Sequence, residues 1–285
     1  MKEESSDGLR LQYQDPKTLL FNAVIAGNIC KVKQLVSSKI DKNLVIHSPV
    51  KWEGATVIGI ASHEGYVDIV KFLVESGTSV NFADPCLGRN ALHWACMGNQ
   101  MSIAKYLIES GANVNHIDKD YVTPLVQATL CQNIELVKLL IRHGANANIV
   151  DRLQCSPLHY ACKYRNSAMV ETIIKSGCIL HNYSSLVKGT PFSNIWLHMD
   201  MELCHLLLDA GYNLKKDRWF QQNKDNLDCG TKSTDLMVRQ KNIKSLSNLC
   251  RVEIRTFFKG MNLDKGIDVF EIPRELKSFL KFDDY

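Results

Sequence analysis

The chain has 285 residues, 45% of them hydrophobic, and a formal net charge of +4 at pH 7. This composition predicts a folded core, while the mild charge and the lack of a dense Lys/Arg run argue against nucleic-acid binding. The first residues lack the apolar segment of a signal peptide, and no apolar run reaches the roughly 18 residues of a membrane span, so we expect no membrane association. Without a secretion signal, the ten cysteines should be reduced thiols of a cytoplasmic or nuclear protein.

Residues 1–14 predict a polar tail, and a repeating pattern extends over residues 15–217. A residue suited to capping a helix recurs in steps of 34, 33, 33 and 34 residues, at Thr56, Asn90, Thr123, Ser156 and Thr190. A glycine that can end the second helix of a repeat follows each time, at Gly77, Gly111, Gly144, Gly177 and Gly211. Two short amphipathic helices cannot bury their apolar faces alone, so the repeats must stack.

The repeats resemble ankyrin repeats, most closely in Thr123-Pro124-Leu125 and Ser156-Pro157-Leu158-His159. Recurrence in phase makes the resemblance specific, and it implies an all-α solenoid of about six repeats, each a helix-turn-helix joined to the next by a hairpin loop. The first repeat lacks a clear leading hairpin, and the sixth has Ile195 where the others have alanine. Atypical end repeats are typical of a solenoid, because they face water on one side.

Ankyrin stacks bind proteins on a concave face made of hairpin tips and first helices, so the resemblance implies a protein partner here. The residues expected to be exposed on that face are His63, Glu64, Trp94, Met97, Lys119, Asp120, Tyr121, Arg152, Leu153, Tyr160, Lys163 and Tyr164. The candidates for substrate contact are Trp94, Met97, Tyr121, Arg152, Tyr160, Lys163 and Tyr164, because aromatic and basic side chains dominate many interfaces. A second interpretation stays open for Trp94 and Tyr160, which could instead pack between neighbouring repeats.

The sequence predicts neither a metal site nor a catalytic centre. Two His-x-x-Cys units begin at His93 and His159, but they are two repeats apart and too distant to share an ion through bonds of ~2 Å. No phosphate-binding glycine loop, Ser/His/Asp arrangement or pair of catalytic carboxylates is present, so we expect no cofactor and no enzymatic activity. The resemblance implies that both histidines hydrogen-bond the backbone of neighbouring repeats.

Residues 218–244 are polar and lack periodicity, which predicts a connector or the remnant of a further repeat. Ser245 is suited to capping a helix that continues to about residue 258. Its apolar residues fall on one side of that helix: Leu246, Leu249, Cys250, Ile254, Phe257 and Phe258. Such a stripe either covers the last repeat or binds a partner.

Residues 245–285 resemble a SOCS box. An elongin-binding box over 245–254 has Leu246, Cys250 and Ile254 at the spacing of that family. A cullin box over about 269–280 keeps Ile272-Pro273, but Phe270 and Glu271 replace its leading Leu-Pro. The resemblance implies elongin contacts by Leu246, Leu249, Cys250 and Ile254. It implies cullin contacts by Phe270, Ile272, Pro273, Leu276 and Leu280.

Together these patterns predict a non-catalytic substrate-recognition adaptor of a ubiquitin ligase. The ankyrin face would hold an unidentified protein substrate. The SOCS box would dock on elongin C, which carries elongin B, and on a cullin with its RING subunit, cullin-5 rather than cullin-2. The alternative is an ankyrin scaffold or inhibitor whose C-terminal helix caps the stack, in which case removing the tail should destabilise the repeats sharply.

Overall fold

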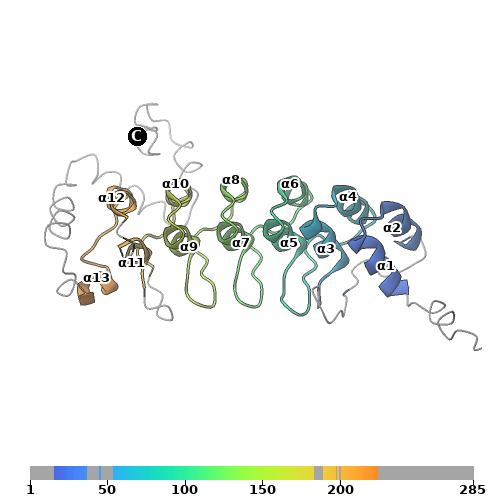
Figure 1. The fold of residues 1–285 in the computed structure, drawn as a ribbon, viewed down its shortest axis with the longest axis horizontal. Coiled ribbons are helices and arrows are strands. Elements are labelled where there is room, and N and C mark those ends of the chain that lie inside the picture. The colour runs from blue at the N-terminus through green and yellow to red at the C-terminus, as the bar shows by residue number, and fades with distance from the viewer. Residues whose placement is uncertain are drawn as a thin grey trace, which may run out of the picture. The chain divides into compact units, whose positions relative to one another are not determined.

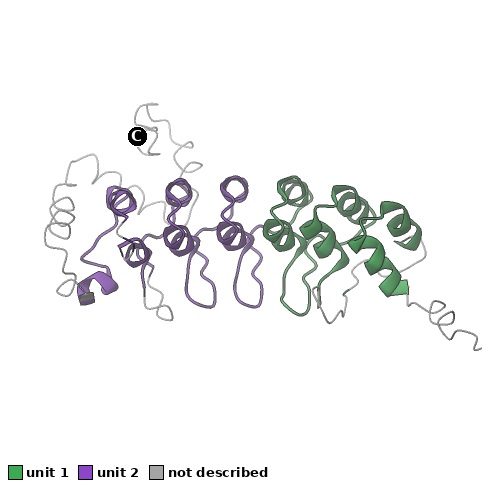
Figure 2. Cartoon of the chain, viewed as in Figure 1, with its two compact units in different colours: residues 1–113 green, residues 114–285 purple. Residues whose placement is uncertain are grey.

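The computed structural model describes residues 16–36, 45, 54–182, 189–196, 198 and 200–223. The chain divides into two compact units, residues 1–113 and 114–285 (Figure 2). In the described residues every regular element is a helix, as the all-α repeat fold requires, and none of these helices is long and apolar enough to cross a membrane. The predicted tail 1–14 and SOCS box 245–285 lie outside the described residues.

Unit 1 contains three helix pairs (Figure 1). Their bounds are α1 (Pro16–Ile25) with α2 (Ile29–Val36), α3 (Val57–Glu64) with α4 (Val67–Glu75), and α5 (Ala91–Met97) with α6 (Met101–Glu109). First helices pack on first helices, α1 on α3 and α3 on α5, and second helices pack on second helices in the same order. The unit is therefore two helical layers with a shared apolar core.

Unit 2 repeats this arrangement and adds a short last helix (Figure 1). Its helices are α7 (Pro124–Leu130), α8 (Ile134–Arg142), α9 (Pro157–Lys163), α10 (Ser167–Lys175), α11 (Pro191–Trp196), α12 (Met201–Asp209) and α13 (Arg218–Asn223). The first helix α9 packs between α7 and α11, and α8 packs against α10. The last helix, α13, lies in the stretch expected to be a connector.

Side chains at the predicted capping positions begin the first helices. The Asn90 side-chain oxygen accepts a hydrogen bond from the His93 N–H at 3.1 Å, and Thr123 Oγ1 accepts one from the Val126 N–H at 3.2 Å. Pro124 follows at the first helical position, where a missing N–H removes no intrahelical bond. The predicted helix starts are confirmed at these repeats, and the caps fix where each hairpin loop ends and each helix begins.

Small residues and left-handed glycines set the packing of each repeat. The four alanines of the first helices are fully buried: Ala61, Ala95, Ala128 and Ala161. Ile195 takes their place in the sixth repeat and is also fully buried. Gly111 and Gly144 each have φ +87°, a conformation that costs other residues free energy, so glycine ends the second helices as the sequence predicts.

Asparagine side chains tie each hairpin to the next within a unit. Asn115 Nδ2 donates to the Gly144 carbonyl at 3.0 Å, and its Oδ1 accepts from the Asn146 N–H at 2.7 Å. Asn81 makes the same two bonds in unit 1, to Gly111 and Asn113. Because backbone groups at the base of each loop are satisfied in this way, neighbouring loops keep a fixed spacing.

The C-terminal end of the described stack is covered by α13. Phe220 is fully buried and packs edge-on against Phe192 of α11, with ring centroids 5.9 Å apart. Asp217, 2% exposed, caps α13 by accepting from the Phe220 N–H at 2.8 Å, and it also accepts from the hydroxyls of Thr190 and Tyr212. The polar sequence around residue 217 therefore contains a buried, fully hydrogen-bonded carboxylate.

Candidate functional site

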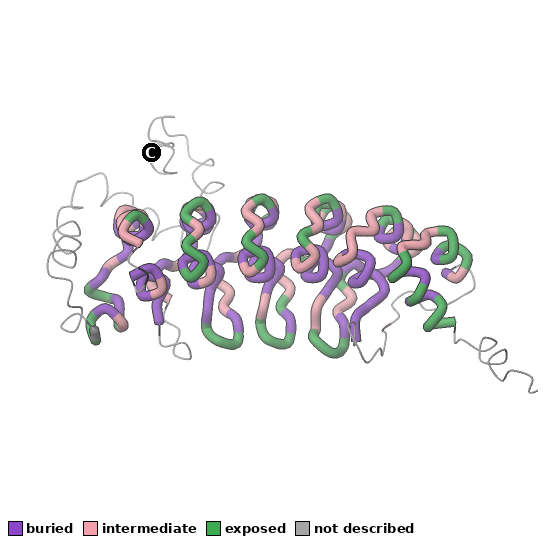
Figure 3. The backbone as a smooth tube through the Cα atoms, in the orientation of Figure 1, coloured by how far each residue is buried: buried purple, intermediate pink, exposed green. Residues whose placement is uncertain are grey.

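Two hairpin loops of unit 2, residues 115–122 and 148–155, are exposed at their tips (Figure 3). They carry five of the residues that the sequence singles out: Lys119, Asp120, Tyr121, Arg152 and Leu153. A buried carboxylate closes each tip. Asp118 Oδ1 accepts from the N–H groups of Asp120 and Val122 at 2.9 Å each. Asp151 Oδ1 likewise closes the second tip, and both aspartates are nearly inaccessible. The tips are held in one shape, and a partner cannot contact these two acids directly.

The two tips are joined to each other through Arg152. Its backbone N–H donates to the Asp120 carbonyl at 2.8 Å, and its guanidinium lies 3.5 Å from the Asp120 carboxylate. Both side chains are well exposed, so this ion pair is worth at most about 1 kcal/mol. The backbone bond sets the register of the tips, and the guanidinium remains accessible to a partner.

Tyr121 is held in an unfavourable backbone conformation at the first tip. Its φ is +60° and its side chain is 55% exposed, whereas the corresponding position of the preceding hairpin is Gly88, with φ +75°. A side chain in the left-handed region costs roughly 1–2 kcal/mol. Gln154, at the same position of the next hairpin, has φ +61°, so this conformation belongs to the hairpin and is not specific to Tyr121. An exposed aromatic ring on a rigid loop is a good anchor for a binding partner.

We expect Tyr121→Gly to stabilise the protein by about 0.5–1 kcal/mol, because glycine adopts φ +60° without steric cost. Lys119→Gly at the same tip is the matched control. Lys119 lies outside the left-handed region, so glycine there should lower stability by about 0.5–1 kcal/mol through chain entropy. Urea unfolding followed by circular dichroism measures both. Equal losses in the two variants would show that Tyr121 is not strained.

The first helix α9 extends this surface from the second tip. Tyr160, Lys163 and Tyr164 lie on one helix face at the i, i+3 and i+4 positions. Lys163 and Tyr164 are exposed and Tyr160 is half-buried. Tyr160 donates its hydroxyl to Asp151 Oδ2, and burial together with this bond raises its pKa well above the usual range. The bond to Asp151 thus holds the Tyr160 ring in place between the second tip and the end of α9.

Six residues form what we call the tip surface: Tyr121, Arg152, Leu153, Tyr160, Lys163 and Tyr164. The sequence predicted exposure for all six, and five of them are exposed while Tyr160 is half-buried. They lie on two adjacent repeats of unit 2, whose tips are joined through Arg152 and whose second tip is joined to α9 through Tyr160. The sequence analysis did not single out Asp118 and Asp151, which shape the tips. Their signal was present, because an aspartate recurs at Asp84, Asp118 and Asp151.

Trp94 in unit 1 does not have the predicted exposure. It is 4% exposed, its indole N–H donates to Asp84 Oδ2 at 3.3 Å, and its ring lies against His63. Gly59 leaves the space for that ring, since a Cβ there would lie 2.7 Å from Trp94 Cδ1. The expectation of an exposed Trp94 is therefore wrong, and the packing interpretation accounts for it. Met97 is half-buried beside Arg89.

The titratable groups near the tip surface are arranged for structure. His159 is 2% exposed, and its Nδ1 accepts from the Ser156 N–H at 3.1 Å, which closes the cap of α9. Burial raises the pKa of the Cys162 thiol well above its usual value and that of Cys204 to about 12, so neither is a thiolate at neutral pH. Among the described residues no cluster of His, Cys, Asp or Glu could hold a metal ion.

Comparison with known protein families identifies two parts of the chain. A model of ankyrin repeats in three copies matches residues 20–118 and 102–183. A SOCS box model matches residues 242–281. No curated protein matches the chain. The second match contains every residue predicted to contact elongin or cullin, all of which lie outside the described residues.

Proposed function

The chain belongs to the ankyrin repeat and SOCS box family, and on that premise we propose that it is the substrate receptor of an elongin B/C–cullin-5–RING ubiquitin ligase. Proteins of this family are typically non-catalytic adaptors of cullin–RING ligases. The observation that carries the proposal is the presence, in one chain, of a repeat array with an exposed binding surface and a C-terminal SOCS box.

The proposed docking of the SOCS box follows from residue chemistry and family resemblance. Leu246 would enter an apolar pocket of elongin C, with Leu249, Cys250 and Ile254 along the same contact. Cysteine suits such a site because its small side chain packs as a hydrophobe. Cullin contacts would come from the cullin box, namely from Phe270, Ile272, Pro273, Leu276 and Leu280.

The repeats would supply a substrate to the ligase, and the ligase would supply the chemistry. A substrate held on the ankyrin face stays close to the ubiquitin-charged enzyme that the cullin and its RING subunit carry. The rate gain comes from effective concentration, which a linked assembly raises strongly without any catalytic residue in this chain.

The end of the repeat array favours the adaptor over the scaffold alternative. A scaffold would need its C-terminal helix to cover the last repeat. That role is already filled by α13, which buries Phe220 against Phe192 and is capped by Asp217. We therefore assign the apolar stripe predicted from residue 245 onward to a partner.

The choice of cullin is tested with purified components. The chain is bound to elongins B and C and mixed in parallel with cullin-5 and cullin-2, each with its RING subunit. We expect at least tenfold tighter binding to cullin-5, or about 1.4 kcal/mol, because Ile272-Pro273 retains the second half of its box. Equal or tighter binding to cullin-2 would contradict the cullin-5 assignment and leave the adaptor role intact.

A further inference from the structure

We propose that the tip surface binds an acidic segment of the partner protein that carries at least one large apolar side chain. This inference rests on the proposed function, because it names the chemistry of the substrate segment. It is carried by three properties of the tip surface: its apolar anchors, its charge, and its rigidity.

The apolar anchors are unusually exposed for large side chains. Tyr121 is 55% exposed, Leu153 is 48% exposed and Tyr164 is 37% exposed. The first two are carried on adjacent tips, and the third lies at the end of α9. Between them the half-buried ring of Tyr160 is fixed by its bond to Asp151. A partner side chain that covers these groups gains hydrophobic burial, and aromatic groups of this kind dominate binding energy at interfaces.

The charge of the same surface is positive. Arg152 and Lys163 are exposed, and Arg165 adds another exposed cation directly after Tyr164. Lys163 and Arg165 make no ion pair with any described residue. The exposed acid at the tips is Asp120, which lies beside Arg152. Asp118 and Asp151 are buried, with Oδ1 of each accepting from backbone N–H groups, so a partner can contact the exposed cations but cannot contact these two acids directly. Complementarity therefore calls for a negatively charged partner.

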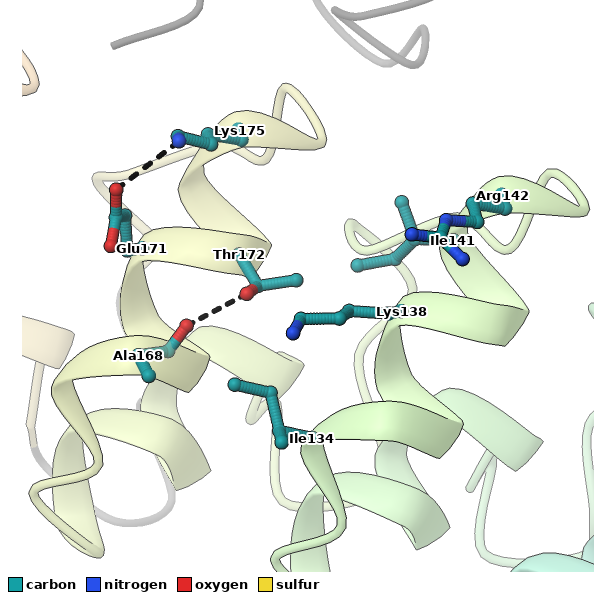
Figure 4. A pocket seen from close by; sticks show the side chains of 8 residues that line it. All are labelled: Ile134, Lys138, Ile141, Arg142, Ala168, Glu171, Thr172 and Lys175. Carbon is teal, nitrogen blue, oxygen red and sulfur yellow. Dashed lines mark hydrogen bonds and ion pairs between the residues drawn. The ribbon is translucent and has the colours of Figure 1, made fainter. Parts of the chain in front are cut away.

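The groove between the second helices offers a useful contrast (Figure 4). It is lined from α8 by Ile134, Lys138 and Arg142, and from α10 by Glu171 and Lys175. Lys138 Nζ forms an ion pair with Glu135 Oε1 at 2.9 Å, and Lys175 Nζ forms one with Glu171 Oε1 at 3.2 Å. Most of its positive charge is balanced within the groove, so an acidic segment gains less there. Arg142, on that groove, provides a control cation.

Rigidity of the tip surface lowers the cost of binding the acidic segment. Both tips are closed by buried carboxylates and joined by the Arg152 backbone bond, so the surface is ordered before a partner arrives. A pre-ordered surface saves the entropy that ordering would cost on binding.

The test is selection from a random-peptide display library on the full chain, bound to elongins B and C where it captures them. We expect recovered peptides to be net negative with an aromatic or aliphatic residue. Their affinity should fall about tenfold or more in the double variant Arg152→Glu, Lys163→Glu, and should weaken several-fold as salt rises from about 0.05 to 0.5 M. Arg142→Glu should bind them like the wild type. Tyr164→Ala, at an exposed position, should weaken them without any change of charge.

Several results would overturn the inference. One is the recovery of neutral or basic peptides, or of no peptides above background. Another is unchanged peptide affinity in the charge-reversed variant. A third is a concentration-dependent dimer of the chain that this variant abolishes, because a second copy of the chain would then be the occupant of the tip surface. Elongin capture is measured on the same proteins. If elongins bind and acidic peptides do not, only this inference fails. If acidic peptides bind the tip surface and elongins do not, the adaptor function fails.

Discussion

Replacing Leu246 and Cys250 together by alanine should weaken binding of elongins B and C by roughly 30- to 1000-fold, which corresponds to ~2–4 kcal/mol at an interface hot spot. Both residues lie in the SOCS box match, and they are the proposed anchors of the elongin C contact. Truncation removes the apolar side chains that would fill the pocket. Calorimetric titration of the elongin B/C dimer into the purified chain measures the change.

The chain provides a matched control for this double substitution. Leu236 and Cys229 are the same residue types but precede the SOCS box match, which begins at residue 242. Leu236→Ala with Cys229→Ala should leave elongin affinity within about twofold of the wild type. Wild-type affinity in the Leu246/Cys250 variant, or an equal loss in both variants, would contradict the proposed elongin contact.

Acidification from pH 7 to pH 5 should lower the free energy of unfolding by about 2 kcal/mol through His159 alone. Burial lowers the pKa of His159 from 6.5 to about 4, against smaller opposing effects of the Asn182 backbone and the Asp151 carboxylate. The unfolded chain therefore takes up a proton near pH 6.5 that the folded chain resists until near pH 4. The stability is complete above the unfolded pKa and is lost as the pH falls toward the folded pKa.

Urea unfolding at both pH values, with two histidine variants, isolates this effect. His159→Gln removes the titrating group and should shrink the difference between pH 7 and pH 5 by about 2 kcal/mol, whatever its stability at pH 7. His143→Gln changes an exposed histidine at the end of α8 and should keep the full difference. Burial also lowers the pKa of His181, so the stability of His159→Gln should still depend on pH to a smaller extent. An unchanged difference in His159→Gln would show that His159 is not the cause.

Local rules predicted the repeats because each rule acts within a few residues. Capping by Thr123 and the left-handed Gly144 depend only on nearby backbone groups, and both are found where the sequence places them. The period then fixes which helices are neighbours. Fold class therefore followed from sequence with few errors.

Packing between repeats was the harder part to predict. The side chain of Trp94 is buried because Gly59, in the preceding repeat, leaves space for it, and that space depends on a residue 35 positions away. Tyr160, at a comparable place in α9, is only half-buried, although it donates to Asp151 as Trp94 donates to Asp84. Likewise Asp217 is only a polar residue at the end of the repeats in the sequence, until Thr190 and Tyr212 are seen to donate to it. Exposure at each of these positions depends on contacts that no local pattern records.

Affinity purification of the tagged full chain from cells, followed by mass spectrometry, tests the adaptor role most directly. The account predicts that elongins B and C are recovered together with one cullin and its RING subunit, and that all of them are lost together when Leu246 and Cys250 are replaced by alanine. Partners of the ankyrin face should remain bound to both baits. Absence of elongins and cullins from the wild-type bait would contradict the account and leave an ankyrin scaffold.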